Sequence, residues 1–79
     1  MGQLILYYTQ YCHLCDEAES YLLAAGLNGN YEKLEIDDDP VLLERYEIHI
    51  PVIKRIDNQQ ELFWPFDRLE LAKFLEPEK

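Results

Sequence analysis

The only two cysteines of the chain, Cys12 and Cys15, lie three positions apart at the end of an apolar segment. Helix-forming residues follow them, from Asp16 to Leu23. A helix begins with unpaired backbone N–H groups and a partial positive charge, and both stabilise a thiolate. The thiolate is the form of cysteine that attacks a disulfide. This position therefore indicates thiol–disulfide chemistry, in which Cys12 attacks and Cys15 resolves the mixed disulfide.

Three other uses of the pair remain open: inert buried thiols, a disulfide that only locks the fold, and a zinc site. Zinc takes four ligands in a tetrahedron, so the pair would need further ligands from His49, His13 or Asp16. The sequence contains no second C-x-x-C and no H-x-x-x-H. We therefore predict no metal site.

The two histidines lie close to the features that carry the chemistry. His13 is inside the cysteine pair, where its protonated ring would favour a thiolate at Cys12; its ring could equally point into solvent. His49 precedes Pro51 by two residues. For His49 we expect an exposed loop imidazole without a role in the chemistry.

Length and composition predict one small domain, residues 1–79. Apolar residues make up 48% of the chain and aromatic residues 13%, which argues against disorder. No apolar run reaches the roughly 18 residues of a membrane span, and no signal peptide is evident, so we expect a cytoplasmic monomer. Sixteen acidic against seven basic residues give a net charge of −9. This charge argues against nucleic acid or anionic membranes as partners.

Hydrophobic spacing and turn residues predict the order β-α-β-α-β-β-α. The first two strands, joined through a helix, are expected to be parallel, and the last two to form an antiparallel hairpin. The expected class is therefore α/β, with a four-stranded mixed sheet and flanking helices. The predicted strands are Gln3–Thr9, Tyr31–Ile36, Val52–Arg55 and Gln60–Phe63, and the predicted helices Cys12–Ala25, Pro40–Tyr46 and Asp67–Leu75.

Helix ends and buried faces can also be predicted. Asp39 is expected to cap the second helix and Asp67 or Pro65 to shape the start of the third, with Gly26 as a left-handed cap after the first. The acidic triplet at 37–39 is better explained by capping than by calcium, whose loop needs ligands over about twelve residues. The tail, 76–79, is expected to fray. The expected buried positions are Leu14, Ala18, Tyr21, Leu22 and Ala25, then Val41, Leu42 and Tyr46, then Leu69, Ala72, Phe74 and Leu75.

An aromatic cluster is expected where the hairpin meets the third helix, from Phe63, Trp64 and Phe66. Core packing is the expectation for these rings, and a hydrophobic rim around the cysteines is the alternative.

Three segments resemble thioredoxin-fold proteins, most of all the small glutaredoxin-like family found in bacteria. They are 7–15 with the cysteine pair, 35–37 with Pro40, and 45–52. The resemblance implies a thioredoxin-like fold and a cis peptide bond between Ile50 and Pro51, beside the cysteines. It also implies that Ile50 and Pro51 position a substrate chain as an added strand. We assign Tyr11 and Asp67 to the same substrate-binding group.

The sequence departs from glutaredoxins where those proteins hold glutathione. Glutaredoxins place a Gly-Gly pair before an Asp at the last helix, whereas here Trp64 and Pro65 precede Phe66 and Asp67. Glycines permit the close backbone approach that such a site needs. Glu47 also adds negative charge where many relatives have glycine before the proline. Glutathione is therefore the less favoured partner, although Asp67 matches.

These features predict a thiol–disulfide oxidoreductase that acts on a protein disulfide or dithiol through Cys12 and Cys15, without a bound cofactor. Two alternatives stay open. One is a thioredoxin-fold module that binds extended peptides beside Ile50 and Pro51 without turnover. The other is a carrier of a metal ion or cluster.

Overall fold

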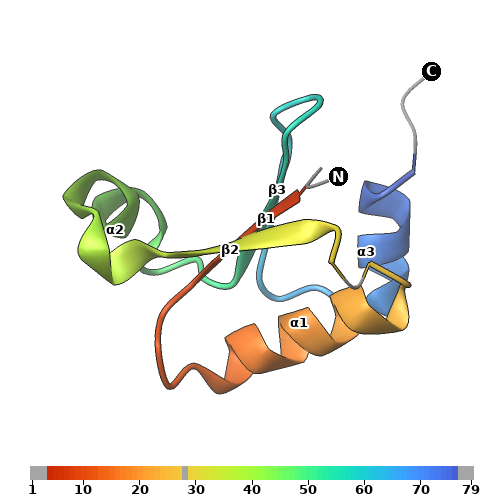
Figure 1. The fold of residues 1–79 in the computed structure, drawn as a ribbon, viewed down its shortest axis with the longest axis horizontal. Coiled ribbons are helices and arrows are strands. Elements are labelled where there is room, and N and C mark those ends of the chain that lie inside the picture. Colours follow the sequence, from red (N-terminus) through yellow and green to blue (C-terminus); the bar gives the residue numbers. More distant parts are fainter. Residues whose placement is uncertain (1–3, 28, 77–79) are drawn as a thin grey trace.

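The computed structural model describes residues 4–27 and 29–76, which form one mixed sheet with helices against it (Figure 1). The helices are α1 (His13–Ala24), α2 (Pro40–Tyr46) and α3 (Arg68–Phe74), with a short 3-10 helix, η1, at Ile36–Asp38. The strands are β1 (Leu4–Tyr8), β2 (Tyr31–Glu35), β3 (Val52–Arg55) and β4 (Glu61–Phe63). The predicted order of elements is confirmed. Gln3, at the expected start of the first strand, lies outside the described residues.

The strands are arranged in the order β2-β1-β3-β4. β1 pairs with β2 in parallel, with Tyr8 opposite Glu35, whereas β1 and β3 are antiparallel. β3 and β4 form the predicted hairpin, with Val52 opposite Phe63. One edge of the sheet therefore collects the ends of β1, β2 and β4 and the start of β3. The segments that carry the cysteine pair and the X-Pro motif both begin or end at this edge.

Each face of the sheet has its own core. Leu6 and Ile53 point toward α1 and α3, where Leu22 and Leu71 cover them. Figure 1 shows these two helices next to each other, with α2 at the left of the molecule. On the other face, Tyr7 and Val52 pack with Ile36 and Tyr46 of the η1–α2 segment. Alternation along β1 therefore divides its side chains between two helix layers.

The predicted helix ends are confirmed. The Asp39 carboxylate accepts hydrogen bonds from the N–H groups of Val41 (2.9 Å) and Leu42 (3.4 Å), and Pro40 occupies the first turn. The Asp67 carboxylate accepts from the Glu70 N–H at 2.8 Å. These contacts satisfy backbone donors that a helix start leaves unpaired.

Gly26 ends α1 with a φ of 83°, a left-handed conformation that glycine adopts without strain. The N–H of Leu27 donates to the Leu22 carbonyl at 3.1 Å, and the N–H of Gly26 to the Leu23 carbonyl at 3.0 Å. This pair of bonds closes the last turn of the helix and confirms the predicted cap.

Several predicted core positions are wrong. Val41 in α2, Leu69 and Ala72 in α3, and Leu14 and Ala25 at the ends of α1 are exposed. The buried residue of α3 is Leu71. A helix of seven residues has only two turns, so one or two positions face the sheet.

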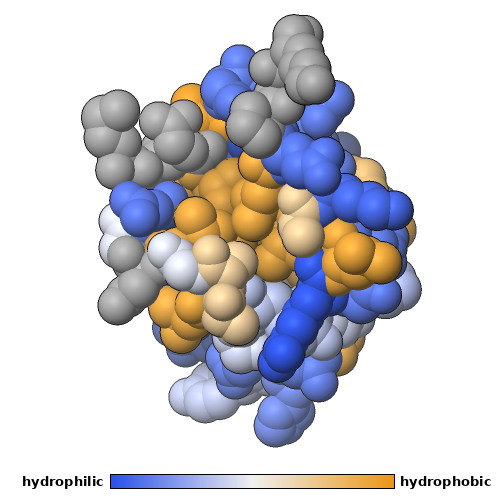
Figure 2. Space-filling view, turned by 90° about the vertical axis from the view of Figure 1, so that its right-hand side faces the viewer, coloured by the Kyte–Doolittle hydropathy of each residue, from blue (hydrophilic) through white to orange (hydrophobic). Residues whose placement is uncertain are grey.

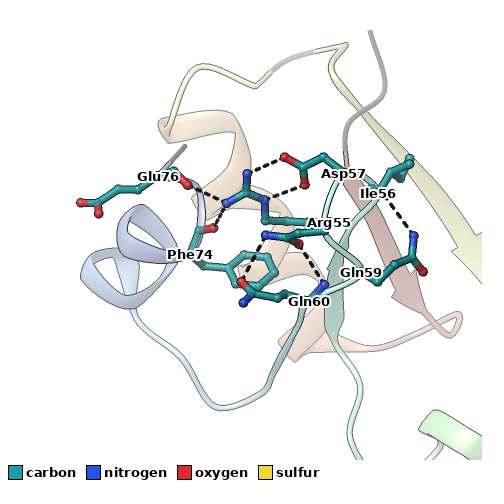
Figure 3. A network of polar contacts seen from close by, with 8 residues as sticks. Arg55, Ile56, Asp57, Gln59, Gln60, Phe74 and Glu76 are labelled. Carbon is teal, nitrogen blue, oxygen red and sulfur yellow. Dashed lines mark hydrogen bonds and ion pairs between the residues drawn. The ribbon is translucent and has the colours of Figure 1, made fainter. Parts of the chain in front are cut away.

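The expected fraying of the tail is wrong at Glu76. The carbonyl of Glu76 accepts a hydrogen bond from Arg55 of β3 at 2.6 Å (Figure 3). Residues 77–79 lie outside the described residues. Figure 2 shows the side of the molecule on which α3 lies, where apolar side chains are surrounded by hydrophilic ones. Within 4–27 and 29–76, no helix is long and apolar enough to cross a membrane.

Candidate active site

Cys12 and Cys15 form a disulfide at the start of α1, with their Cα atoms 5.2 Å apart. Cys12 is the N-cap residue of the helix, and its Sγ accepts a hydrogen bond from the Cys15 N–H at 3.1 Å. The sulfur therefore occupies the position at which a helix offers unpaired N–H groups and its partial positive charge. The same contacts that cap the helix would stabilise negative charge on Sγ after reduction.

The two sulfurs differ in their access to solvent. Cys12 is half-buried, whereas Cys15 is 4% exposed and belongs to the buried side of α1, with Ala18 and Leu22. A large partner can therefore reach Cys12 more easily than Cys15. Attack by Cys12 and resolution by Cys15 stay predictions.

The chain turns sharply between β1 and α1. Tyr11 has a φ of 60°, in the left-handed region that residues other than glycine seldom adopt. Its side chain is almost fully exposed, and His13 and Leu14 are exposed as well. The turn at Tyr11 lets Cys12 return to an extended conformation, with a φ of −104°, just before the helix begins. Exposed apolar and imidazole side chains therefore flank Cys12 along the chain.

The Ile50–Pro51 peptide bond is cis, as the family resemblance implied. Pro51 is buried, and its carbonyl accepts a hydrogen bond from the Trp64 N–H at 3.2 Å. The following residue, Val52, pairs with Tyr7 of β1. Pro51 therefore lies at the sheet edge from which the chain continues to Cys12.

The end of α2 holds the segment before Pro51. The backbone carbonyl of Tyr46 accepts hydrogen bonds from the N–H groups of His49 (2.7 Å) and Ile50 (3.1 Å). The Tyr46 ring stacks on Tyr7, with centroids 4.4 Å apart, and its hydroxyl donates to Glu61 of β4. Tyr46 was predicted to be buried, but these contacts join residues 15 and 39 positions apart and carry no signal in the sequence.

Burial, followed by the hydrogen bond to Glu61, raises the pKa of Tyr46. Burial also raises the pKa of Tyr7. Both hydroxyls are therefore neutral at physiological pH, and Tyr46 acts as a hydrogen-bond donor to a carboxylate.

His49 differs from its prediction as an exposed loop imidazole. Its ring is half-buried and stacks on Phe63, with centroids 4.7 Å apart and an interplanar angle of 17°. The predicted aromatic cluster is divided as a result. Phe66 is buried and Trp64 is half-buried against it, whereas Phe63 stays exposed beside His49. Core packing is thus correct for Phe66 and wrong for Phe63.

Asp67 uses its carboxylate within the protein, as the cap of α3. The Trp64–Pro65 peptide bond before it is cis, a feature that the sequence analysis did not predict. The residues that stand in place of the glycine pair thus form a bend between β4 and α3. Trp64 packs against Phe66 and Tyr21, with centroids 5.0 and 6.2 Å away.

A zinc site would need several ligand side chains close together. Among residues 4–27 and 29–76, no group of three or more His, Cys, Asp or Glu side chains lies close enough together to hold a metal ion. The two sulfurs are bonded to each other.

Comparisons with known proteins agree with this geometry. The model of the glutaredoxin-like domain (DUF836) family matches residues 3–76. The crystal structure of target protein XcR50 from X. campestris is similar at a TM-score of 0.83 and 39% identity, over 91% of this chain and 93% of that one. Its solution structure gives a TM-score of 0.77 and 37% identity over the whole of both chains.

A solution structure of protein Ne2328 from Nitrosomonas europaea shares the fold, at a TM-score of 0.74 and 24% identity, over 94% of this chain and 91% of that one. A comparison with curated proteins finds no match. The family match covers nearly the whole chain, including the cysteine pair and the cis-proline. The chain therefore belongs to the glutaredoxin-like domain (DUF836) family.

Proposed function

We propose that the protein is a thiol–disulfide oxidoreductase that exchanges electrons with a disulfide of another protein. One observation carries the proposal: the Cys12–Cys15 disulfide lies at the start of α1, with the Cys12 sulfur as the N-cap. A sulfur in this position is activated by backbone N–H groups.

In the reductive direction, the Cys12 thiolate attacks one sulfur of the partner disulfide. A mixed disulfide forms, and the other partner sulfur leaves as a thiolate that takes up a proton. The Cys15 thiolate then attacks Sγ of Cys12, so the Cys12–Cys15 disulfide forms and the second partner sulfur leaves. The cysteine pair gives up two electrons, and the partner disulfide is reduced to two thiols. The oxidative direction is the reverse.

The remaining predicted site residues support binding in this proposal. The segment at Ile50 and Pro51 positions an extended partner chain at this edge of the sheet, with the Ile50 carbonyl as its acceptor, because the Ile50 N–H and the Pro51 carbonyl are bonded to Tyr46 and Trp64. Tyr11 and His13 flank Cys12 in the chain with exposed side chains, so we assign Tyr11 to contact with the partner and His13 to support of the Cys12 thiolate. For Asp67 we propose a part in shaping the far end of the binding surface, through its cap of α3.

The cysteine pair stores the electrons itself, so the proposed reaction needs no bound cofactor. Glutathione remains a possible reductant of the pair, but the bend at Trp64 and Pro65 gives it no glycine-lined site. We propose that the protein acts as a monomer in the cytoplasm, where other thiols are kept reduced.

The test is reduction of insulin by the protein in the presence of dithiothreitol. We expect the wild type to accelerate the reaction and Cys12→Ser to return it to the uncatalysed rate. Cys15→Ser is the matched control, because it keeps the attacking thiol and loses only the resolving one. It should therefore accumulate a mixed disulfide through Cys12, visible by mass spectrometry. Equal rates for the wild type and Cys12→Ser would overturn the proposal.

A further inference from the structure

Four exposed apolar side chains belong to the segments that carry the disulfide and the cis-proline or pair with them. Tyr11 is 99% exposed, Ile48 84%, Leu14 44% and Phe63 42%. Single exposed apolar residues are ordinary on protein surfaces. Four of them on segments that meet at one edge of the sheet, beside a redox pair, offer apolar surface to a partner. We call these four residues the apolar collar.

The collar is arranged in two halves around the reactive sulfur. Tyr11 and Leu14 lie on either side of Cys12 in the chain. Ile48 and Phe63 lie around the segment that leads to Pro51, because His49 stacks on Phe63 and Trp64 donates to the Pro51 carbonyl. The pairing of Val52 with both Tyr7 and Phe63 brings the two halves to the same edge of the sheet.

Negative charge dominates the segments that meet at this edge. Two carboxylates lie in residues 9–17, six in 35–51 and one in 63–68. The same segments contain only two cationic side chains, and both are engaged within the protein. Arg45 lies 3.8 Å from Glu61, and the Arg68 guanidinium lies 5.6 Å from the centroid of the Tyr21 ring.

We propose that the apolar collar docks an extended, lysine- and arginine-rich protein segment that carries an apolar side chain next to its reactive cysteine. The inference rests on the proposed function and names the class of its substrate. The carboxylates attract the basic flanks and raise the rate of encounter, an effect that weakens as salt increases. The collar buries the apolar side chain once Cys12 has been reached. Glutathione, with two carboxylates and one ammonium group, is repelled by the same charge.

Three disulfide-containing peptides test the charge part of the proposal. They share one core with an apolar residue next to the cysteine and differ only in flanks of Lys, Ser or Glu. The measurement is the second-order rate constant for their reduction by the reduced protein, at low and at high salt. We expect the order Lys, Ser, Glu, with at least about tenfold between the first and last at low salt. High salt should bring the three rates together.

Equal rates for the three peptides, or a preference that salt does not change, would overturn the inference and leave the oxidoreductase proposal standing. Failure to reduce any of the three would instead contradict the oxidoreductase proposal itself. The two ideas therefore fail in different ways.

Variants locate the preference on the surface. Asp37→Asn, Asp38→Asn and Glu47→Gln, combined, should lower the rate with the Lys peptide at least about threefold and leave the Ser peptide unchanged. Glu32→Gln, Glu70→Gln and Glu76→Gln, combined, are the control, because they remove the same number of carboxylates from outside the segments that form the site edge. An equal loss in the control would show that only the net charge of the protein matters, and would overturn the assigned surface.

The collar has its own pair of variants. Ile48→Ser should slow reduction of peptides with an apolar residue next to the cysteine, and should not affect peptides with Ser there. Val41→Ser is the matched control, since Val41 is also a β-branched residue exposed on the surface, but in α2. An equal effect of Ile48→Ser on both kinds of peptide would remove the collar from the proposal.

Discussion

Two polar networks tie helices to the sheet, one on each face. On the face covered by α1 and α3, Arg55 of β3 donates to the backbone carbonyls of Phe74 (2.8 Å) and Glu76 (2.6 Å) (Figure 3). It also donates to both carboxylate oxygens of Asp57. On the opposite face, the hydroxyl of Tyr46 at the end of α2 donates to Glu61 of β4.

The networks differ in what they hold. Arg55 pairs with Leu4, at the sheet edge opposite the disulfide, and its guanidinium satisfies carbonyls that the end of α3 leaves unpaired. The carbonyl of Tyr46 instead accepts from the two residues before Pro51. The comparison indicates that Arg55 secures the fold, whereas Tyr46 also positions the segment that we propose to bind substrate.

Replacing Arg55 should give the largest loss of stability. Arg55→Met keeps most of the buried side-chain volume and removes the hydrogen bonds to Phe74, Glu76 and Asp57, so we expect the free energy of unfolding to fall by about 2–3 kcal/mol. Urea unfolding measures the loss. Arg55→Lys is the control: it keeps the charge and loses the planar fork, and should recover only part of the stability.

The reactivity of the cysteine pair separates the two networks. At temperatures where Arg55→Met is folded, its reduction potential and its rate of peptide disulfide reduction should equal those of the wild type. A change in the potential would show that the two ends of the sheet are coupled. It would contradict the conclusion that Arg55 affects only the stability of the fold.

Tyr46→Phe should have a smaller effect on stability and a larger one on activity. The substitution keeps the ring stacked on Tyr7 but leaves Glu61 without the hydroxyl donor, which costs about 1–2 kcal/mol. We expect KM for peptide disulfides to rise, with the alkylation rate of Cys12 unchanged. Tyr31→Phe is a matched control, because it removes a hydroxyl–carboxylate bond to Glu19 (2.5 Å) at the other edge strand.

A rise in KM that is equal in Tyr46→Phe and Tyr31→Phe would show that general loosening of the fold, not the position of the Pro51 segment, controls binding. The two networks would then differ in their effect on stability alone, and Tyr46 would have no separate role in substrate binding.

The sequence predicted the features that depend on local chemistry. These features follow from residues close together in the chain. They are the caps at Asp39 and Asp67, the left-handed Gly26, the antiparallel hairpin of β3 and β4, and the position of the cysteines at a helix start. The resemblance to a known family added the cis-proline at Pro51.

Features that depend on residues far apart could not be predicted in this way. Arg55 contacts residues 19 and 21 positions later, and Tyr46 contacts Glu61 across 15 positions. Short helices were the other weakness. In α2 and α3, two turns of apolar residues do not define which side faces the sheet, so Val41 and Leu69 were assigned to the core although both are exposed.

The caps of α2 and α3 allow the same comparison between the two faces of the sheet, with a smaller expected loss of stability. Asp39→Ala and Asp67→Ala each remove a carboxylate that accepts from the first turn of a seven-residue helix, so each should cost about 1 kcal/mol. Thermal unfolding measures both. If Asp67 also shapes the substrate surface, only Asp67→Ala should change KM for a peptide without charged flanks. Identical kinetics in the two variants would restrict Asp67 to its role as a cap.

High pH should weaken the contact between Tyr31 of β2 and Glu19 of α1. Burial, and then the hydrogen bond to Glu19, raise the pKa of Tyr31 to about 12. The folded state therefore binds this proton more tightly than the unfolded state, whose tyrosine pKa is about 10. Its contribution to stability is complete below about pH 10 and is lost as the pH rises toward 12. Tyr31→Phe should flatten this part of the stability curve, measured by urea unfolding at each pH.

The smallest expected effect concerns Asp57, the exposed partner of Arg55. Hydrogen bonds from Arg55 lower the pKa of this carboxyl group below its usual value. The folded state therefore favours the ionised form, so the contribution to stability is present at neutral pH and is lost as the pH falls below about 4. Asp57→Asn should flatten the acid side of the stability curve. Because Asp57 is exposed while the two carbonyls are bonded to a buried guanidinium, its loss should be much smaller than that of Arg55→Met; equal losses would mean that the ion pair, not the carbonyl contacts, secures α3.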